Sequence, residues 1–574
     1  MKTKSKREDN LNNISKIIFH KFFWKGLSMA NSTNEPNDDI FKQFKEHSVA
    51  EFFKKNRQML GFSGKTKSLT IVVHELVTNS LDAAEEAGIL PEIFVQVDEL
   101  DKETKDHYRL TVKDNGPGIP KSHLGKALGQ MLAGTKFHRY LQQRGQQGIG
   151  AAACTMFSYL TTGQKTRAIS VHKGKKLTAD ISIDFKTNSA IVEEIANEES
   201  IENGLTVISE YKDVRYEKSD YGVFEYLRRT ALANPHCTIT LVEPNGEKTT
   251  FARSIDANPR RPYEIKPHPL GVTTHDLLEF AKRNTEYKKV GLFLQNSFAR
   301  VSAAKVDELR ELVKDVDFNK NPTDLSWPEA EKIVKAFAQV KWIAPAMDSL
   351  VPIGKEQIEL SFRNIFNPEL IMVTERPTKV YRGGIPFMIE AGIAYGGGIV
   401  NADKKGVIMR FANRVPLLFD TSGCAITESI KSIEWKRYSI KSFDEEPVIV
   451  LVNLVSVHVP YTSAGKQAIS KEEDVEAEIK NAVMEAARAI QKYLSGKRKA
   501  NEILNKRKLV SRYVNQLSSD LASLTGARKI EIEKQLTAII EHKYTTEKGE
   551  LDDESAVVDT EKETQKEEME GGDE

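Results

Sequence analysis

Apolar and polar residues alternate with a helical period over residues 69–85, which predicts an amphipathic helix ended by Gly88. At about 100° per residue, Glu75, Asn79 and Asp82 fall within an arc of about 60°. The opposite face is apolar and consists of Val73, Val77, Leu81 and Ala84. An acid, an amide and a second acid on one stripe suit water activation and metal coordination, although an ordinary solvated helix face has the same pattern.

Period-two alternation predicts a sheet in the part of the chain that follows this helix. Strands are expected at residues 92–100, 107–114, 166–173, 176–185, 190–195, 204–212, 236–244 and 247–254. Helices are expected at 48–62, 121–135 and 224–235. A further helix is expected to begin after the glycines near 150 and to continue up to Tyr159. Residues 40–255 should therefore form a two-layer α/β domain, a mixed sheet with helices on one face.

The second half of the chain mixes helical and strand patterns. Four prolines make 256–271 a linker, and helical patterns at 274–284, 288–298 and 302–314 predict an insert that ends near 324. A third domain is expected at 325–471, with a helix at 327–340 and strands at 370–381, 387–396, 407–419 and 447–459. Residues 472–543 are expected to form a helical arm. The N-terminal extension 1–39 is expected to be mobile, and the acidic tail 544–574 to be disordered because it lacks a hydrophobic period.

Composition excludes several classes of protein. The 574 residues suffice for about three to four domains. With 83 basic and 82 acidic residues the net charge is +1, so any binding to nucleic acid must use local patches. Cys154, Cys237 and Cys424 stand far apart, which argues against a zinc site or a disulfide framework and suits a reducing cytoplasm. No apolar run is long enough to span a membrane, and lysines interrupt the start of the chain where a signal peptide would be apolar.

Two glycine-rich motifs follow the predicted helix at 69–85. Asp114 to Gly118 read DxGxG directly after a strand, and Gly145 to Gly150 read GxxGxG directly before a helix. Neither motif is a P-loop, because the GK[ST] ending is missing. ExxxNSxDA, DxGxG and GxxGxG in this order resemble the GHKL ATPases, which include gyrase-type topoisomerase subunits, Hsp90-type chaperones, MutL-type repair proteins and histidine kinases.

The resemblance implies roles for the residues of the first two motifs. Glu75 would be the general base that orients and deprotonates the attacking water. Asn79 would hold Mg²⁺ through its amide oxygen. Asp114 would accept a hydrogen bond from the adenine amino group of ATP. Gly116 and Gly118 would allow the backbone to turn tightly beside the base.

The same resemblance implies that the glycine loop and neighbouring residues contact ATP. Gly145, Gly148 and Gly150 would free backbone N–H groups to face phosphate at a helix N-terminus. The full set of further ATP-binding candidates is Thr135, Lys136, Gly145, Gln146, Gln147, Gly148, Ile149, Gly150, Ala151 and Thr206. Lys466, in the segment TSAGKQAIS, would reach the γ-phosphate from the third domain.

Residues 40 to 525 together resemble the B subunits of archaeal type IIB topoisomerases. The implied architecture is α/β (α+β): a GHKL or Bergerat ATPase sandwich, a helix–two-turns–helix insert, a ribosomal-S5-like transducer domain and a long C-terminal helix. The implied activity is an ATP-operated clamp. Two copies dimerise on binding ATP and capture a DNA duplex, while the A subunit of the topoisomerase, docked on residues 472–543, cleaves DNA in an A2B2 heterotetramer. The complex would relax supercoils and decatenate duplexes.

Several alternatives remain at this point. Trp435, Lys436 and Tyr438 lie in a WKRY segment that could contact DNA or could be an ordinary surface. The basic helical insert could bind DNA or be solvated. A chaperone-like or MutL-like clamp would share the ATP site. A histidine kinase would carry its ATP domain at the end of the chain, not at the front.

Overall fold

The computed structural model of the chain describes residues 48–134, 139–145, 148–401, 405–463 and 465–543. The N-terminal extension expected at 1–39 and the acidic tail expected at 544–574 lie outside these residues.

Eight strands of the described residues form the first sheet, in the order β5-β4-β3-β6-β2-β1-β7-β8. The strands are β1 Glu92–Glu99, β2 His107–Asp114, β3 Thr166–His172, β4 Lys175–Asp184, β5 Ser189–Glu199, β6 Gly204–Lys212, β7 Thr238–Val242 and β8 Lys248–Phe251. β1 runs parallel to β7 and antiparallel to β2. The sheet is therefore mixed, as predicted for residues 40–255.

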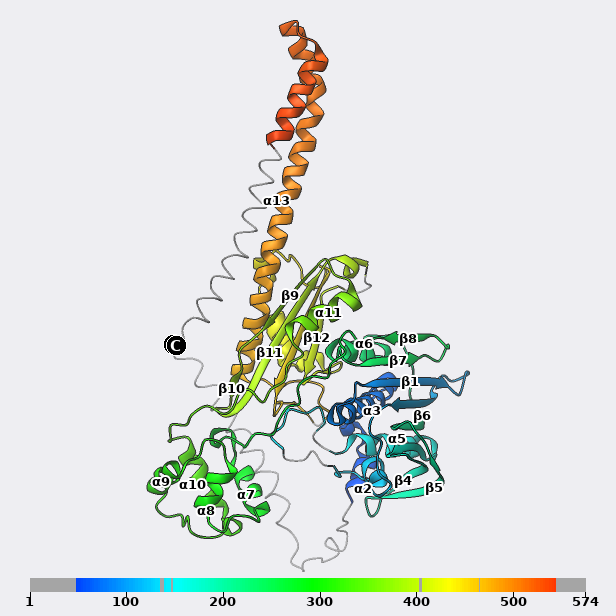
Figure 1. The fold of residues 1–574 in the computed structure, drawn as a ribbon, viewed down its shortest axis with the longest axis vertical. Helices are drawn as coiled ribbons and strands as arrows, with labels where there is room; N and C mark the ends of the chain where they lie inside the picture. Colours follow the sequence, from blue (N-terminus) through cyan, green and yellow to red (C-terminus); the bar gives the residue numbers. More distant parts are fainter. Residues whose placement is uncertain (1–47, 135–138, 146–147, 402–404, 464, 544–574) are drawn as a thin grey trace, which may run out of the picture. The chain divides into compact units, whose positions relative to one another are not determined.

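Helices cover one face of this sheet (Figure 1) and share a hydrophobic core with it. They are α2 Val49–Lys55, α3 Lys65–Ala87, α4 Lys121–Gly129, α5 Gly150–Thr162 and α6 Val223–Ala233, with a 3-10 turn, η2, at Arg57–Leu60. Gly88 ends α3 with a φ of +75°, and its N–H bonds to carbonyls of the last turn. On the opposite face of the sheet, exposed polar side chains form ion pairs, such as Arg109–Glu210 at 2.7 Å. The predicted two-layer arrangement is confirmed.

A separate helical unit follows the linker and has its own core. Its helices are α7 Thr274–Arg283, α8 Val290–Ser297, α9 Ala303–Leu312 and α10 Trp327–Phe337. Ile333 and Phe337 of α10 are buried in the same core as Leu277 of α7 and Phe293 of α8. The expected boundary at residue 325 therefore precedes a helix that packs with the insert, because the apolar face of α10 has its partners there.

A second sheet forms the next part of the chain. Its strands within the described ranges are β9 Leu370–Glu375, β10 Lys379–Tyr381, β11 Ile385–Tyr395, β12 Val407–Ala412, β13 Val415–Pro416 and β14 Val448–Ser456, in the order β10-β11-β14-β12-β13 with β9 also on β11. The strand expected at 370–381 is interrupted around Pro377, which has no N–H for a ladder bond. The helices of this part are α11 Lys355–Phe366, α12 Ala425–Lys431 and α13 Glu473–Thr525.

Both faces of the second sheet are covered, which explains the continuous apolar run in β14. Val450 and Val452 share a core with α12 and α13, whereas Ile449 and Leu451 share another with α11. Every residue of β14 is buried, as its sequence predicted. Helix α11 is not among the predicted elements, although Ile358, Phe362 and Phe366 recur every four residues.

Helix α13 is 53 residues long, and only its first part packs against the second sheet. Farther along, apolar side chains are exposed, among them Leu509, Tyr513 and Leu517. Residues 529–543 form another helix, and Arg507 of α13 pairs with Glu541 of that helix at 3.3 Å. No helix in the described ranges is both long and apolar enough to cross a membrane.

Candidate active site

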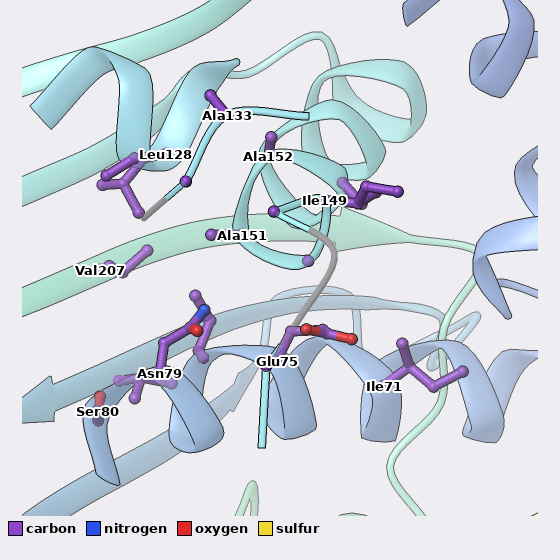
Figure 2. A pocket seen from close by; sticks show the side chains of 18 of the residues that line it. Ile71, Glu75, Asn79, Ser80, Leu128, Ala133, Ile149, Ala151, Ala152 and Val207 are labelled. Atoms are coloured by element: carbon purple, nitrogen blue, oxygen red, sulfur yellow. The ribbon is translucent and has the colours of Figure 1, made fainter. Parts of the chain in front are cut away.

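A cavity of about 290 Å³ lies between α3, the end of β2, the start of α5 and the loop that precedes α13. Figure 2 shows Glu75 and Asn79 on the face of α3 that borders the cavity, with Ile149 and Ala151 across from them. Glu75 and Asn79 of the predicted polar stripe thus face a cavity, whereas Asp82 is buried against Arg144 and does not line it. An apolar lining with a few convergent polar groups is typical of sites for small molecules and cofactors.

The side chain of Glu75 lies against Gly150, at the start of α5. A Cβ placed on Gly150 would come within 1.8 Å of Glu75 Oε2, so any larger residue there would displace the carboxylate. The side chain of Glu75 keeps 35% of its surface exposed, and His74 Nε2 lies 4.0 Å from its Oε1. Burial lowers the pKa of His74, although the neighbouring Glu75 opposes the change. The carboxylate is therefore accessible from the cavity.

Asp114 ends β2 and is held by hydrogen bonds on both oxygens. Ser80 Oγ donates to Oδ2 at 2.7 Å, while the backbone N–H groups of Gly116 and Leu205 donate to Oδ1 at 3.0 and 3.1 Å. Burial raises the pKa of Asp114, and these three hydrogen bonds oppose the rise. The side chain is consequently fixed at the cavity wall.

Glycines at the cavity permit close approaches of the backbone. Gly118 has a φ of +67°, and a Cβ there would lie 2.1 Å from the carbonyl oxygen of Val171. Gly145 and Gly148 line the cavity, and Gly150 begins the 13-residue helix α5. The first N–H groups of a helix are unpaired within it and attract anions, so this edge of the cavity is suited to phosphate.

Lys466 comes from the loop before α13 and lines the same cavity. Its Nζ donates to the carbonyl oxygen of Arg144 at 3.3 Å, across 322 positions of sequence. Its backbone is in the left-handed region, with a φ of +52°, and its N–H bonds to the carbonyl oxygen of Ser463 at 3.1 Å. The loop that follows the second sheet thus contributes a cation to a cavity formed mainly by residues of the first α/β domain.

The other sequence candidates divide into three groups. Ile149 and Ala151 line the cavity. Thr135, Lys136, Gln146 and Gln147 lie outside the described residues. Thr206 pairs with the exposed Lys113 on the solvent face of the sheet, whereas Leu205 and Val207 line the cavity, so Thr206 is not retained as an ATP-binding residue.

Sequence reasoning missed two residues of the site. Ser80 follows Asn79 in the helix and holds Asp114, a link between motifs 34 positions apart. Arg144 precedes the glycine loop and is buried by acidic partners on α3. A hydroxyl beside the polar stripe of α3 was the available signal for Ser80, but no local pattern identifies the partners of Arg144.

The WKRY segment forms a 3-10 turn, η7 Trp435–Tyr438, and its two rings point inward. Trp435 and Tyr438 are 7% and 9% exposed, and Trp435 Nε1 donates to the carbonyl oxygen of Ile430 at 3.1 Å. The expectation that these rings contact DNA is therefore not retained, because they complete the core of the second sheet. Lys436 is exposed.

Trp435→Ala should lower the free energy of unfolding of this domain by about 3–5 kcal/mol, because it leaves a cavity in a packed core. Lys436→Ala should change it by less than about 0.5 kcal/mol. Urea denaturation followed by circular dichroism measures both. Unchanged stability of Trp435→Ala would contradict the position of this ring in the core.

Comparison with known proteins identifies the class of the ATP site and then the family. Residues 64–187 match the family described as histidine kinase-, DNA gyrase B-, and HSP90-like ATPase, and residues 345–506 match the transducer of the topoisomerase VI B subunit. The B subunit of type 2 DNA topoisomerase 6 from Pyrococcus horikoshii is 43% identical over 558 residues, which cover 89% of this chain and 98% of that protein. The protein of the same name from Methanothermobacter thermautotrophicus is 44% identical over 511 residues, covering 87% and 96%. The chain therefore belongs to the family of type 2 DNA topoisomerase 6 B subunits.

The solved structures matched by the chain include the 43K ATPase domain of Thermus thermophilus gyrase B in complex with an aminocoumarin. It is 14% identical, with a TM-score of 0.37, and covers 80% of this chain and 98% of that one. The resemblance to the GHKL ATPases and to type IIB B subunits is confirmed by the family matches and the sequence relatives.

Proposed function

We propose that the cavity bordered by α3 and α5 binds and hydrolyses ATP and that the chain is an ATP-operated clamp on DNA. The observation that carries the proposal is the presence of Lys466 beside Glu75, Asn79 and Gly148 in one cavity. A cation from the second sheet at the phosphate end of a nucleotide site gives hydrolysis a direct mechanical consequence. Removal of the γ-phosphate deprives Lys466 of its charge partner and releases one part of the chain from the other.

Glu75 acts as the general base in this proposal. Its carboxylate borders the cavity next to the start of α5, where the phosphates would lie, and it retains solvent access for a water molecule. Asn79, one helical turn farther along α3, supplies an amide oxygen at the same wall.

The donor set fits Mg²⁺ held largely by the substrate. The described residues contain no group of three acidic, histidine or cysteine side chains that could hold a metal alone. Mg²⁺ typically takes one or two protein ligands and completes its shell with phosphate oxygens and water. Asn79 would be such a ligand, and the ion would offset negative charge on the phosphates.

Asp114 selects adenine. Ser80 and two backbone N–H groups fix the carboxylate so that it accepts hydrogen bonds at one position of the wall. An adenine amino group donates to such an acceptor, whereas the carbonyl of guanine would be repelled. The glycine loop, through Gly145, Gly148 and Gly150, surrounds the phosphates with backbone N–H groups. Gln146, Gln147, Thr135 and Lys136 belong to the same proposal through the family resemblance.

The partners follow from the family and from α13. The apolar side chains that α13 exposes beyond its packed part, including Leu509 and Tyr513, suit docking of the DNA-cleaving A subunit. Two copies would dimerise through their ATPase domains when ATP binds and would enclose one duplex, giving the A2B2 heterotetramer. A cytoplasmic location is part of this proposal.

The test is ATP hydrolysis by the chain together with the DNA-cleaving A subunit, with and without long duplex DNA, using Glu75→Gln as the blank. We expect DNA to stimulate hydrolysis at least about tenfold, because closing the clamp on a duplex assembles the site. The stimulated activity should vanish in Glu75→Gln. Glu75-dependent hydrolysis that is indifferent to DNA would retain the ATP site but would favour a chaperone-like clamp instead.

A further inference from the structure

Residues 142–144, directly before the glycine loop, are linked by polar contacts, directly or through Glu85, to residues 351, 413 and 414 in the domain of the second sheet. Gln142 and Val351 exchange two hydrogen bonds: Gln142 Nε2 donates to the Val351 carbonyl at 2.7 Å, and the Val351 N–H donates to Gln142 Oε1 at 2.6 Å. Asn413 Nδ2 donates to the carbonyl oxygen of Gln143 at 3.2 Å. The glycine loop therefore begins at a segment whose position depends on the second sheet.

Arg144, the last of these residues, is part of a buried ionic cluster centred on Glu85. Arg144 Nη2 and Nη1 donate to Glu85 at 2.6 and 3.0 Å, and Nη1 also donates to Asp82 at 2.7 Å. His236 Nε2 lies 2.8 Å from Glu85 Oε1. Arg414, from the second sheet, donates from Nη2 to Glu85 Oε2 at 3.1 Å. One carboxylate of α3 is thus shared by the glycine-loop segment and by the second sheet.

The cluster is largely buried beside a smaller cavity of about 120 Å³, and burial strengthens its charged contacts. Both Arg144 and Arg414 are 6% exposed. Burial raises the pKa of Glu85, but the two guanidinium groups and the hydrogen bonds outweigh burial and hold the pKa well below its usual range. Glu85 consequently stays ionised at neutral pH, and its position is set by both arginines.

The backbone at Arg414 points to a purpose for its side chain. Asn413 and Arg414 form the two-residue connection between β12 and β13, and their φ values are +48° and +68°. Glycine is strongly preferred at the second position of such a turn, because a side chain there is sterically unfavourable. An arginine at a position suited to glycine indicates that its guanidinium contact offsets a local cost.

A hydrogen bond to Asn453 of the second sheet also holds this turn in place. The N–H of Arg414 donates to Asn453 Oδ1 at 3.2 Å, and Asn453 Nδ2 donates to the buried Glu390 at 2.7 Å. Glu390 in turn accepts the N–H groups of Ile353 and Gly354 at the start of α11. A continuous polar path therefore runs from α11 through Arg414 and Glu85 to Arg144, whose carbonyl oxygen accepts the bond from Lys466.

We propose that Arg414 is a positioning residue for ATP hydrolysis, which holds Arg144 through Glu85 and so seats the glycine loop and Lys466 together over the nucleotide. This inference rests on the proposed ATP site. Arg414 touches no nucleotide in this proposal. It acts on the geometry of the loop, and a displacement of about 1 Å in a reacting geometry can cost up to about 10²-fold in rate.

The test compares Arg414→Gly, Arg414→Lys and Arg382→Gly in the complex with the DNA-cleaving A subunit, with DNA present. Arg414→Gly removes the guanidinium but gives the turn an Asn-Gly pair, which its backbone favours, so the variant should fold. Arg382→Gly is the matched control: another arginine of the same domain with a positive φ, of +47°, that pairs with Glu472 and is not part of the cluster. Arg414→Lys tests whether a cation alone restores function.

We expect Arg414→Gly to lower kcat about tenfold and to leave the affinity for a non-hydrolysable ATP analogue within about twofold. Arg414→Lys should fall between the wild type and Arg414→Gly, and Arg382→Gly should match the wild type. In the background of Lys466→Ala, Arg414→Gly should lower kcat little further, because both changes disturb the same placement of the glycine loop and Lys466 over the nucleotide.

A wild-type kcat in Arg414→Gly overturns the proposal and leaves the cluster as a structural fastening. Equal losses in Arg414→Gly and Arg382→Gly overturn it too, since they would reflect general destabilisation. The proposed ATP site is tested separately in the same assay by Glu75→Gln. Hydrolysis at the wild-type rate in that variant would refute the assignment of Glu75 as the base, whatever Arg414 does.

Discussion

Glu75→Gln should reduce ATP hydrolysis by about 10²–10⁴-fold and leave nucleotide binding within about twofold of the wild type. The amide has nearly the same shape as the carboxylate, so the contact with Gly150 persists and the cavity keeps its volume. An amide does not accept the proton of the attacking water at neutral pH. The variant should therefore bind ATP and dimerise on it, yet remain closed.

Single-turnover release of phosphate measures the chemical step, and titration with a fluorescent ATP analogue measures binding. Glu86→Gln is the control, because it is an exposed glutamate on the same helix and does not line the ATP cavity. Loss of analogue binding in Glu75→Gln would mean that the residue shapes the site rather than serving as base. Turnover equal to that of the wild type would move the base to another residue.

The parts of the site that could be predicted are those encoded in short stretches. Glu75 and Asn79 lie on one stripe because of helical periodicity alone, and Asp114 ends a strand whose alternation is evident. Gly118 is required where its φ is +67° and a carbonyl lies against it, which the glycine in DxGxG indicated. In each case the residue's environment is determined by neighbours a few positions away.

The incorrect or missing expectations depend on tertiary packing. Two aromatic residues that flank two basic ones suit a surface or a core edge equally, and the packing of Trp435 against Phe443, with ring centroids 4.9 Å apart, places it in the core. Thr206 lies one position away from the cavity-lining residues of β6, because neighbouring residues of a strand point to opposite faces of the sheet.

The charged cluster around Glu85 could not be found from sequence, because its members come from four separate elements or loops: α3, the segment before the glycine loop, the α6–β7 connection and the β12–β13 turn. Asp82 looked like a third polar residue of the catalytic stripe, but it is 7% exposed and is paired with Arg144. The same lack of local signal applies to Lys466, which was indicated by family resemblance and not by any pattern around it. Long-range pairings of this kind follow from how the two sheets meet, which no periodicity records.

Lys466→Ala should lower ATP turnover by about 10²-fold and abolish strand passage, while binding of ATP analogues weakens by no more than about tenfold. An ammonium group is a compact charge suited to phosphate oxygens, and its removal takes away one of the groups that stabilise the developing negative charge. The left-handed backbone at Lys466 holds the side chain toward Arg144. The alanine variant would lose the positive charge that faces the nucleotide. It would also lose the contact through which hydrolysis affects the second sheet.

Decatenation of linked DNA circles by the complex with the DNA-cleaving A subunit measures strand passage, and phosphate release measures turnover in the same sample. Lys471→Ala is the control, since this nearby exposed lysine pairs with Glu428 at 2.6 Å and does not line the cavity. If Lys466→Ala hydrolyses ATP and decatenates DNA like the wild type, the lysine does not couple the two sheets to the nucleotide. Turnover that persists while decatenation fails would separate catalysis from coupling. ATP hydrolysis would then depend on the first sheet and its helices, and Lys466 would serve only to couple hydrolysis to the second sheet.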